Sequence, residues 1–279
     1  MIVDAHNHFF FPTNKPGVKA VLLDPSVLVN SGVIKRTWLL STGDTFAGLK
    51  GNQDQQILHL AKTYKGFFVP FAYLDFTKKP DIVDYFHKQG FAGLKAIFPP
   101  FAYDDERCFP FYEKAEKSKM PILFHVGGSP YWVPEQMQIG PERMASKNML
   151  IITLDLVAKM FPKLVIITAH MGGKHSYDFA VYFAKGHPNV YLDTSCSIVE
   201  RDSPDKIKEV IKIVGPDKIL FGSDVRGDGP IKKALFWKSY FEAKMRDQEI
   251  GHKIMSLNAE RIISESGFNW KNINLSKQE

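Results

Sequence analysis

The sequence predicts an α/β fold of the (β/α)8 or TIM-barrel class, in which eight parallel strands close into a barrel inside a ring of helices. Short apolar runs rich in β-branched residues alternate with stretches of helical spacing, which indicates repeated βαβ units. Runs such as residues 164–169 and 218–222 are apolar almost throughout, as expected for strands buried on both faces of a parallel sheet. Eight units across 279 residues take about 35 residues each, which matches the size of a (β/α)8 barrel.

We expect eight strands with six clear helices between them. The expected strands span residues 2–9, 33–42, 66–75, 91–98, 121–126, 164–170, 190–195 and 218–223. Helical spacing is clear over residues 55–65, 80–89, 107–118, 148–161, 204–214 and 231–245. Pro25 interrupts residues 18–32, which makes this the weakest helical segment. Because no Gly-, Ser- or Pro-rich linker divides the chain, we expect one barrel domain over residues 1–279, with C-terminal helices after about residue 229.

Composition and charge narrow the class of protein. With 44% hydrophobic and 24% charged residues the chain is an ordinary globular protein, which excludes disordered, collagen-like and disulfide-scaffold classes. The net charge of +6 comes without a Lys/Arg run, so it favours small anionic ligands over nucleic acid. The two cysteines, Cys108 and Cys196, are too few for a disulfide framework and indicate a reducing compartment. Since no signal peptide or transmembrane run is found, we expect a cytoplasmic protein without a membrane partner, and a homodimer is compatible with the sequence.

Residue types that bind metals or move protons end several of the expected strands. The first strand ends in Asp4-Ala-His-Asn-His8, where a doubly wound sheet would carry a glycine-rich phosphate loop. Three other strands end at His125, His170 and Asp224. The carboxyl ends of barrel strands form one rim, where active sites lie. A single histidine of this kind is as often a hydrogen-bonded structural residue, but the same pattern on four strands favours a metal site.

The residue types favour a catalytic zinc site. Residues i and i+2 of a strand project to the same side, so His6 and His8 can bind one ion. Two or three imidazoles with one carboxylate and an open position are typical of catalytic Zn²⁺, although Fe²⁺, Mn²⁺ and Co²⁺ accept the same ligands. The ion lowers the pKa of a bound water towards about 7. We expect this water to attack a carbonyl carbon, while Asp224 or His170 moves the proton to the leaving group.

Five short motifs together resemble a known enzyme family. They are Asp4-Ala-His-Asn-His8, His125, Thr168-Ala-His170-Met-Gly-Gly, Phe221-Gly-Ser-Asp224 and Leu257-Asn-Ala-Glu-Arg261. In this order they resemble the amidohydrolase-2 branch of the amidohydrolase superfamily. That branch contains metal-dependent hydrolases and decarboxylases similar to aminocarboxymuconate-semialdehyde decarboxylase. The motifs extend from residue 4 to residue 261, so the resemblance covers nearly the whole chain.

The resemblance implies that the metal ligands are His6, His8, His125 and Asp224. It leaves two roles open for His170, which is an acid/base beside the water in some members and a ligand in others. The number of ions is also open, because many binuclear relatives carry a carboxylated lysine on the fourth strand and Lys95 lies there. For Lys95 we favour a buried lysine paired with a carboxylate, since it lies well before the end of the expected strand.

Three residues are candidates for substrate binding. Arg226 follows Gly-Ser-Asp where many relatives have an aromatic residue and a proline, so it either binds an anion or forms an ion pair at the rim. Trp132 lies in the long connection after the fifth strand and either stacks on a substrate ring or packs that loop against the barrel. Lys95 is the third, and Ile97 stands where relatives often have a histidine.

We therefore expect a metal-dependent hydrolase that cleaves an amide, lactone or ester bond in a small anionic molecule. The alternative is a metal-dependent, non-oxidative decarboxylase of a small carboxylic acid. It needs the same ligands and at least two basic side chains around the metal. A third hypothesis, a barrel that only binds a ligand or a metal, is disfavoured because every ligand type is present.

Overall fold

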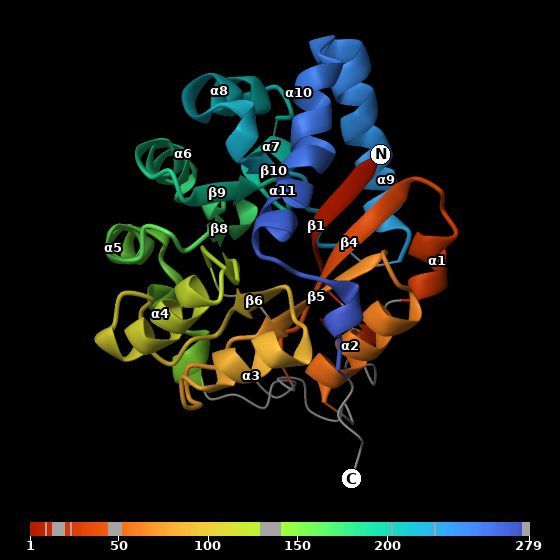
Figure 1. The fold of residues 1–279 in the computed structure, drawn as a ribbon. Helices are drawn as coiled ribbons and strands as arrows, with labels where there is room; N and C mark the ends of the chain where they lie inside the picture. Colours follow the sequence, from red (N-terminus) through yellow and green to blue (C-terminus); the bar gives the residue numbers. More distant parts are fainter. Residues whose placement is uncertain are drawn as a thin grey trace.

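The protein folds as a nearly closed barrel of eight parallel strands, as predicted (Figure 1). A computed structural model describes residues 1–8, 10–12, 20–22, 24–43, 52–128, 141–201, 203–225 and 227–274. The strands are β1 (Ile2–His8), β4 (Ile34–Leu40), β5 (Phe68–Tyr73), β6 (Gly93–Ala96), β7 (Ile122–Phe124), β8 (Ile166–Thr168), β9 (Val190–Asp193) and β10 (Ile219–Leu220). Each pairs in parallel with the next in this order. The first and last strands meet through backbone hydrogen bonds from Ala5 N–H to Phe221 C=O at 2.8 Å and from Asp224 N–H to His6 C=O at 2.7 Å.

Helices surround the barrel (Figure 1). They are α1 (Pro25–Val29), α2 (Gln53–Thr63), α3 (Ile82–Gln89), α4 (Phe109–Lys117), α5 (Leu154–Met160), α6 (Tyr177–Gly186), α7 (Ile198–Arg201), α8 (Lys206–Val214), α9 (Gly229–Ser239), α10 (Gln248–His252) and α11 (Asn258–Glu265). The six expected helices correspond to α2, α3, α4, α5, α8 and α9. The sequence analysis missed α6 and the small antiparallel pair β2 (Phe10–Pro12) and β3 (Ala20–Leu22). None of the helices in the described ranges is long and apolar enough to span a bilayer.

The seven strands from β4 to β10 are shorter than expected, and after β6 and β8 the chain bends early at the rim. β6 ends at Ala96, since Phe98 lies in the left-handed region with φ of +54° and prolines follow it. β8 ends at Thr168, since His170 and Met171 have φ of +61° and +46°. Side chains that the sequence placed inside strands therefore lie closer to the rim.

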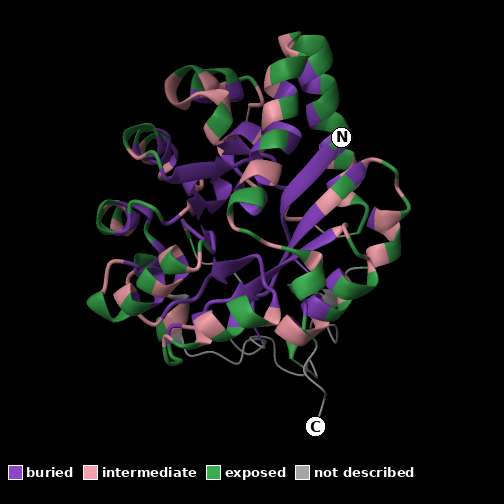
Figure 2. Cartoon of the chain, in the orientation of Figure 1, coloured by how far each residue is buried: buried purple, intermediate pink, exposed green. Residues whose placement is uncertain are grey.

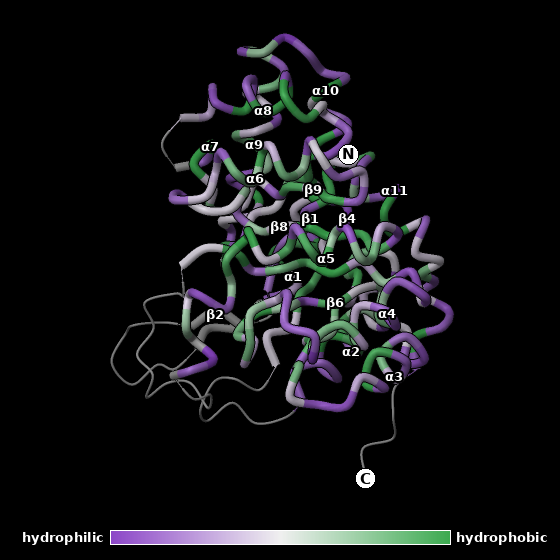
Figure 3. The backbone as a smooth tube through the Cα atoms, turned by 90° about the vertical axis from the view of Figure 1, so that its left-hand side faces the viewer, coloured by the Kyte–Doolittle hydropathy of each residue, from purple (hydrophilic) through white to green (hydrophobic). Residues whose placement is uncertain are grey.

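One apolar cluster fills the inside of the barrel, and we call it the inner cluster. Its members are Val3, Ala5, Trp38, Leu40, Val69, Phe71, Ala92, Leu123, Ile167, Ala169, Tyr191, Leu220, Ala259, Ile262 and Ile263. The last three belong to α11, which packs against β1 and β10 and closes the end of the barrel where the strands begin. In the side view, α11 and β2 lie at opposite ends of the barrel (Figure 3). A second cluster fills the layer between the buried strands and the outer helices (Figure 2).

β1 is irregular where it carries the histidines. Its pairing with β4 shifts by one residue between Asp4 and Asn7. In an uninterrupted strand, Ala5 and His8 would face opposite sides, because side chains alternate. The extra residue shifts the alternation by one, so both side chains can face the inside of the barrel. Ala5 joins the inner cluster, and the ring of His8 contacts that of His6. The irregularity thus joins an apolar interior to a polar rim on one strand.

Asn258 at the start of α11 holds the end plug to the barrel. Its buried amide donates to the C=O groups of Pro216 and Ile219, both at 2.8 Å. We expect Asn258→Ala to lower the free energy of unfolding by about 2 kcal/mol, because two hydrogen bonds from a buried amide are lost. Urea denaturation measures the change. The control Ser264→Ala, on the exposed side of α11, should stay within about 0.5 kcal/mol of the parent. Equal stability of the two variants would contradict this role.

Candidate metal centre

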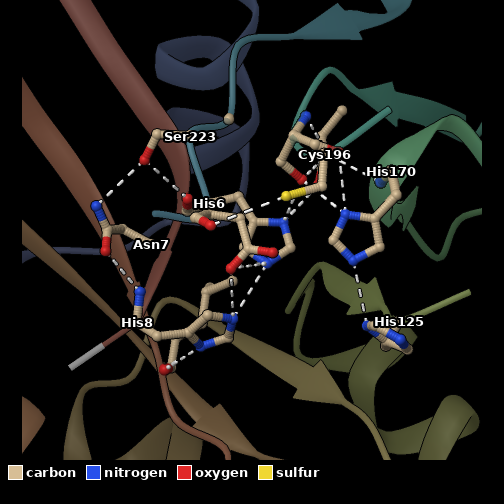
Figure 4. A network of polar contacts seen from close by, with 12 residues as sticks. His6, Asn7, His8, His125, His170, Cys196 and Ser223 are labelled. Atoms are coloured by element: carbon tan, nitrogen blue, oxygen red, sulfur yellow. Dashed lines mark hydrogen bonds and ion pairs between the residues drawn. The ribbon is translucent and has the colours of Figure 1, made fainter. Parts of the chain in front are cut away.

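The imidazole rings of His6 and His8 are each fixed by a hydrogen bond at Nδ1. Nδ1 of His6 lies 2.7 Å from Oδ2 of Asp193, and Nδ1 of His8 lies 3.0 Å from the C=O of Leu40 (Figure 4). A carboxylate and a carbonyl only accept hydrogen bonds, so each Nδ1 carries the proton. Burial lowers the pKa of both imidazoles well below 6.5, which keeps the rings neutral. Each Nε2 therefore presents a lone pair.

These two Nε2 atoms point toward each other. They lie 3.2 Å apart, and neither carries a proton to donate to the other. Oδ1 of Asp224 approaches the same point, at 3.5 Å from Nε2 of His8 and 3.9 Å from Nε2 of His6. Two lone pairs and a carboxylate oxygen facing one point repel one another unless a cation lies among them. Two imidazoles and a carboxylate are also ligands that Zn²⁺ accepts, so the arrangement fits a divalent metal.

Asp224 reaches this point on a tight connection after β10. Its φ of +47° is in the left-handed region, and its N–H bonds the C=O of His6 at 2.7 Å. Gly222 allows the close approach of the two chain segments, because a Cβ there would lie 2.7 Å from the Cβ of His6. Burial raises the pKa of the Asp224 carboxyl, and the charge of Lys95 opposes this shift. The structure thus brings Asp224 together with His6 and His8, while their role as ligands remains a prediction.

Asp193 at the end of β9 is a site residue that the sequence analysis missed. Its buried Oδ2 faces His6, and its Oδ1 accepts from the backbone N–H groups of His170 at 3.0 Å and Ser195 at 2.9 Å. Although Asp193, His6 and His170 form another compact group of ligand atoms, both carboxylate oxygens are already engaged. Asp193 therefore orients the imidazoles. The expected strand ran to residue 195, which hid this carboxylate in its interior.

His125 and His170 extend the site to a row of four imidazoles. The ring of His170 stacks on that of His6 with centroids 5.3 Å apart, and its Nε2 lies 3.2 Å from Nδ1 of His125. Nδ1 of His170 faces the C=O of Ser195 at 3.0 Å, so its Nε2 is an acceptor for His125. The other nitrogen of His125 lies 3.4 Å from the C=O of Gly128. Both nitrogens of His125 face protein atoms, and its role as a ligand stays a prediction.

Burial keeps this whole row neutral. It lowers the pKa of His125 to about 3 and that of His170 well below its ordinary value. The positive charge of Lys95 lowers the pKa of both residues further. Neutral imidazole is the form that binds metal ions, so these rings need not release a proton to do so.

Lys95 extends among these groups from β6. Its side chain is fully buried, and its charge acts on the four histidines, on Asp193 and on Asp224. Nζ has no hydrogen-bond partner among the residues that the structure describes. The expected burial is correct, whereas no carboxylate in the described part of the chain pairs with Nζ, and the end of β6 at Ala96 places Lys95 beside the rim. Burial lowers the pKa of the Lys95 amine, and the two carboxylates oppose this shift.

Asp4 and Ser223 connect β1 with the segment after β10, and these two segments carry the candidate ligands. Oδ1 of Asp4 accepts from the N–H of Ser223 at 2.8 Å and of His6 at 3.2 Å, and its Oδ2 accepts from the Ser223 hydroxyl. Asn7 also donates to Asp4 at 3.3 Å and to the Ser223 hydroxyl at 3.2 Å, the second bond being visible in Figure 4. Burial raises the pKa of Asp4 to about 6, although the bonds from Ser223 oppose this change. Residues that flank the ligands in the sequence motifs thus fix their positions.

The structure describes an arginine near the rim but not the two remaining substrate-binding candidates. Arg226 and Trp132 lie outside the described residues. Arg143, in the long connection after β7, donates from Nε to the C=O of Phe98 at 2.9 Å and pairs with Asp75 at 3.0 Å. This arginine therefore connects its loop to the neighbouring strand ends.

The match to a family model identifies the family of the chain. Residues 3–263 match a model described as Amidohydrolase, so the chain belongs to the amidohydrolase family. This match confirms the resemblance that the five motifs indicated. The family consists of metal-dependent enzymes. Among curated proteins, no sequence matches this chain.

Solved structures with low sequence identity share the fold. An amidohydrolase from Burkholderia multivorans with bound Zn has a TM-score of 0.67 at 12% identity, covering 95% of this chain and 99% of its own. A 2,6-dihydroxybenzoate decarboxylase from Rhizobium has a TM-score of 0.65 at 18% identity, with coverage of 95% and 99%. A probable 2-pyrone-4,6-dicarboxylic acid hydrolase from Acinetobacter baumannii, with citric acid bound, has 0.64 at 13% identity, with 94% and 99%. At these identities the likeness shows the fold alone.

The orienting role of Asp193 gives a test of the site. In Asp193→Asn, one acceptor oxygen becomes an NH₂ donor, which opposes either the Nδ1–H of His6 or the N–H groups of His170 and Ser195. We expect the affinity for Zn²⁺ to fall about 10- to 100-fold. Competition with a chromophoric chelator measures it, and Asp178→Asn on the exposed side of α6 is the matched control. Wild-type affinity in Asp193→Asn would show that this carboxylate does not orient a ligand.

Proposed function

We propose that this protein is a metal-dependent hydrolase that cleaves an amide, lactone or ester bond in a small anionic molecule. One observation carries the proposal: the lone pairs on Nε2 of His6 and His8 face each other at 3.2 Å beside the Asp224 carboxylate. Neutral side chains seldom hold such a contact, whereas a divalent cation makes it favourable. Because the group lies at the carboxyl ends of the barrel strands, it is also where this fold places its chemistry.

His6, His8 and Asp224 would hold the ion, and His125 is the further ligand that we propose. Zn²⁺ is the first choice, because imidazoles with one carboxylate are the ligands of many catalytic zinc sites, although Fe²⁺, Mn²⁺ or Co²⁺ would accept them too. A bound divalent ion lowers the pKa of a water molecule and polarises a carbonyl group. The presence of Zn in the Burkholderia structure supports this choice.

His170 and Asp224 are the residues that we propose for proton transfer. Asp193 and Ser195 fix the backbone and Nδ1 of His170, while its Nε2 accepts from Nδ1 of His125. During the reaction this Nε2 would exchange His125 for a water or a proton. The Asp224 carboxylate lies at the point that the Nε2 atoms of His6 and His8 face, so it would lie beside the nucleophile. Asp224 would therefore take the proton of the nucleophile on a carboxylate oxygen and pass it to the leaving group.

Lys95 supports an anionic substrate. An isolated buried cation is costly, and a carboxylate of the substrate would supply the hydrogen-bond partner that its Nζ lacks among the described residues. The net charge of +6 favours the same class of ligand. The citric acid in the Acinetobacter structure shows that a barrel of this fold accepts a polycarboxylic acid.

A non-oxidative decarboxylase of a small carboxylic acid is the second candidate. Lys95 favours it, since a buried cation would hold the substrate carboxylate, and the Rhizobium decarboxylase has the same fold. We expect such an enzyme to place two basic side chains around the metal. Within the described ranges, Lys95 is one such side chain. Two other basic residues are already paired, Arg143 with Asp75 and Lys233 with Glu200. Hydrolysis therefore remains our first choice.

The remaining expectations belong to this proposal. A small molecule is the expected partner, with neither nucleic acid nor membrane involved. The protein would work in the cytoplasm as a single barrel domain, either alone or as a homodimer.

Substitution of Asp224 tests the metal-dependent mechanism. Asp224→Asn should reduce turnover more than about 100-fold and lower the metal content, because it removes a charged ligand and a proton acceptor. The melting temperature should change little, since a rim residue contributes little to the core. The measurements are elemental analysis and activity on a panel of lactones, amides and aromatic carboxylic acids, with the exposed Asp228→Asn as control. Near-wild-type activity in Asp224→Asn, or full activity after metal removal, would rule out the mechanism.

Lys95→Met tests the anionic substrate class. We expect the KM of an anionic substrate to rise about 10- to 100-fold, since a charged hydrogen bond is lost, while a neutral ester of the same molecule keeps its KM. The variant should be at least as stable as the parent, because an apolar chain of similar length replaces an unpaired buried cation. Lys159→Met, which removes an exposed ion pair with Asp155, is the control. Equal effects on both substrates would contradict the anion-binding role.

A further inference from the structure

A partly buried ion pair lies behind the candidate metal centre. Lys233 belongs to α9 and Glu200 to the short helix α7, and Nζ of Lys233 lies 2.7 Å from Oε2 of Glu200. Their side chains are only 22% and 11% exposed. Neither residue belongs to the motifs of the family resemblance. Taking two charges out of water is costly, so an ion pair at this depth needs further bonds to hold it.

Both members of the pair also bond the backbone of the rim. Nζ of Lys233 donates to the C=O of Ser223 at 2.8 Å, next to Asp224 in the chain. Oε2 of Glu200 accepts the N–H of Cys196 at 2.7 Å. The ion pair thus connects the segment that follows β9 with the segment that follows β10.

The two segments need such support because both are strained. Asp224 and Cys196 are non-glycine residues in the left-handed region, with φ of +47° and +48°. Sγ of Cys196 lies 3.9 Å from the C=O of Asp224, so the two turns are in contact (Figure 4). On the far side, Asp4 holds Ser223 by two hydrogen bonds. Ser223 is therefore fixed by Asp4 from β1 and by Lys233 from α9.

We propose that Lys233 and Glu200 are positioning residues that hold Asp224 in the orientation needed to bind the metal. The inference rests on the proposed metal-dependent function. Lys233 fixes the carbonyl immediately before Asp224, and Glu200 holds both Lys233 and the turn that contacts Asp224. Loss of the pair releases the strained turn at Asp224 and weakens the site without removing a ligand.

The test compares Co²⁺ binding by the full-length wild type and by variants of the pair. Lys233→Met keeps the aliphatic stem and removes both donor bonds, so its Co²⁺ affinity should fall about 10- to 100-fold, with a changed visible spectrum of the bound ion. Lys233→Arg can still donate to both oxygens and should recover most of the affinity. Glu200→Gln keeps an acceptor for Cys196 but loses the charge, and its affinity should fall between wild type and Lys233→Met.

Lys238→Met is the matched control, because Lys238 lies on the same helix and its ion pair with Glu242 is exposed. Its Co²⁺ affinity and spectrum should equal those of wild type. The melting temperature of each metal-free variant separates a loss of stability from a loss of positioning. If Lys233 and Glu200 only stabilise the fold, melting temperatures fall while the folded variants keep the wild-type affinity and spectrum.

The outcomes separate this inference from the proposed function. A wild type that binds no Co²⁺ would overturn both. A wild type that binds Co²⁺, with unchanged affinity and spectrum in Lys233→Met, would overturn only the role of the ion pair. If Lys233→Met does not fold, Glu200→Gln decides by the same criterion. Weaker binding in that variant, with wild-type binding in Lys238→Met, supports the inference.

Discussion

The position of two protons determines the character of the candidate metal centre. Asp193 and the carbonyl of Leu40 each accept the Nδ1–H of a histidine, so both Nε2 lone pairs point at one place. Burial keeps those rings neutral and prevents water from taking over either bond. The two rings are thus oriented before any metal binds. Hydrogen bonds at the two Nδ1 atoms compensate the repulsion between the two Nε2 lone pairs. Asp4 and Ser223 help to hold this arrangement in place.

The rim also balances several buried charges. Asp4 and Asp193 are compensated by hydrogen bonds, mostly from backbone N–H groups and hydroxyls, which stabilise a carboxylate without a cation. Lys233 is compensated by Glu200 and by a carbonyl. Lys95 differs, because nothing in the described part of the chain bonds its amine. This contrast is the reason why we propose a structural role for Asp4, Asp193 and Lys233 but a substrate-binding role for Lys95.

Patterns with a short period allowed the sequence to predict most of the barrel and part of the site. Apolar runs gave all eight strands, and the polar residues at their ends included His6, His8 and Asp224, which the structure brings together. Bends at the rim were not predictable in this way, because the left-handed residues there include Phe98 and Met171, types that seldom adopt such angles. These bends shortened the strands. The expected ends were therefore too late, which concealed the orienting carboxylate of Asp193 and the rim position of Lys95.

The plug formed by α11 has a consequence for how the barrel is assembled during synthesis. Ala259, Ile262 and Ile263 complete an interior whose other members come from strands made much earlier. Until α11 leaves the ribosome, the end of the barrel where the strands begin exposes apolar side chains such as Val3 and Leu220 to water or to chaperones. The strands can pair as they emerge, but their shared interior becomes dry only when α11 arrives. Closure of the core therefore waits for a segment made more than thirty residues after the last strand.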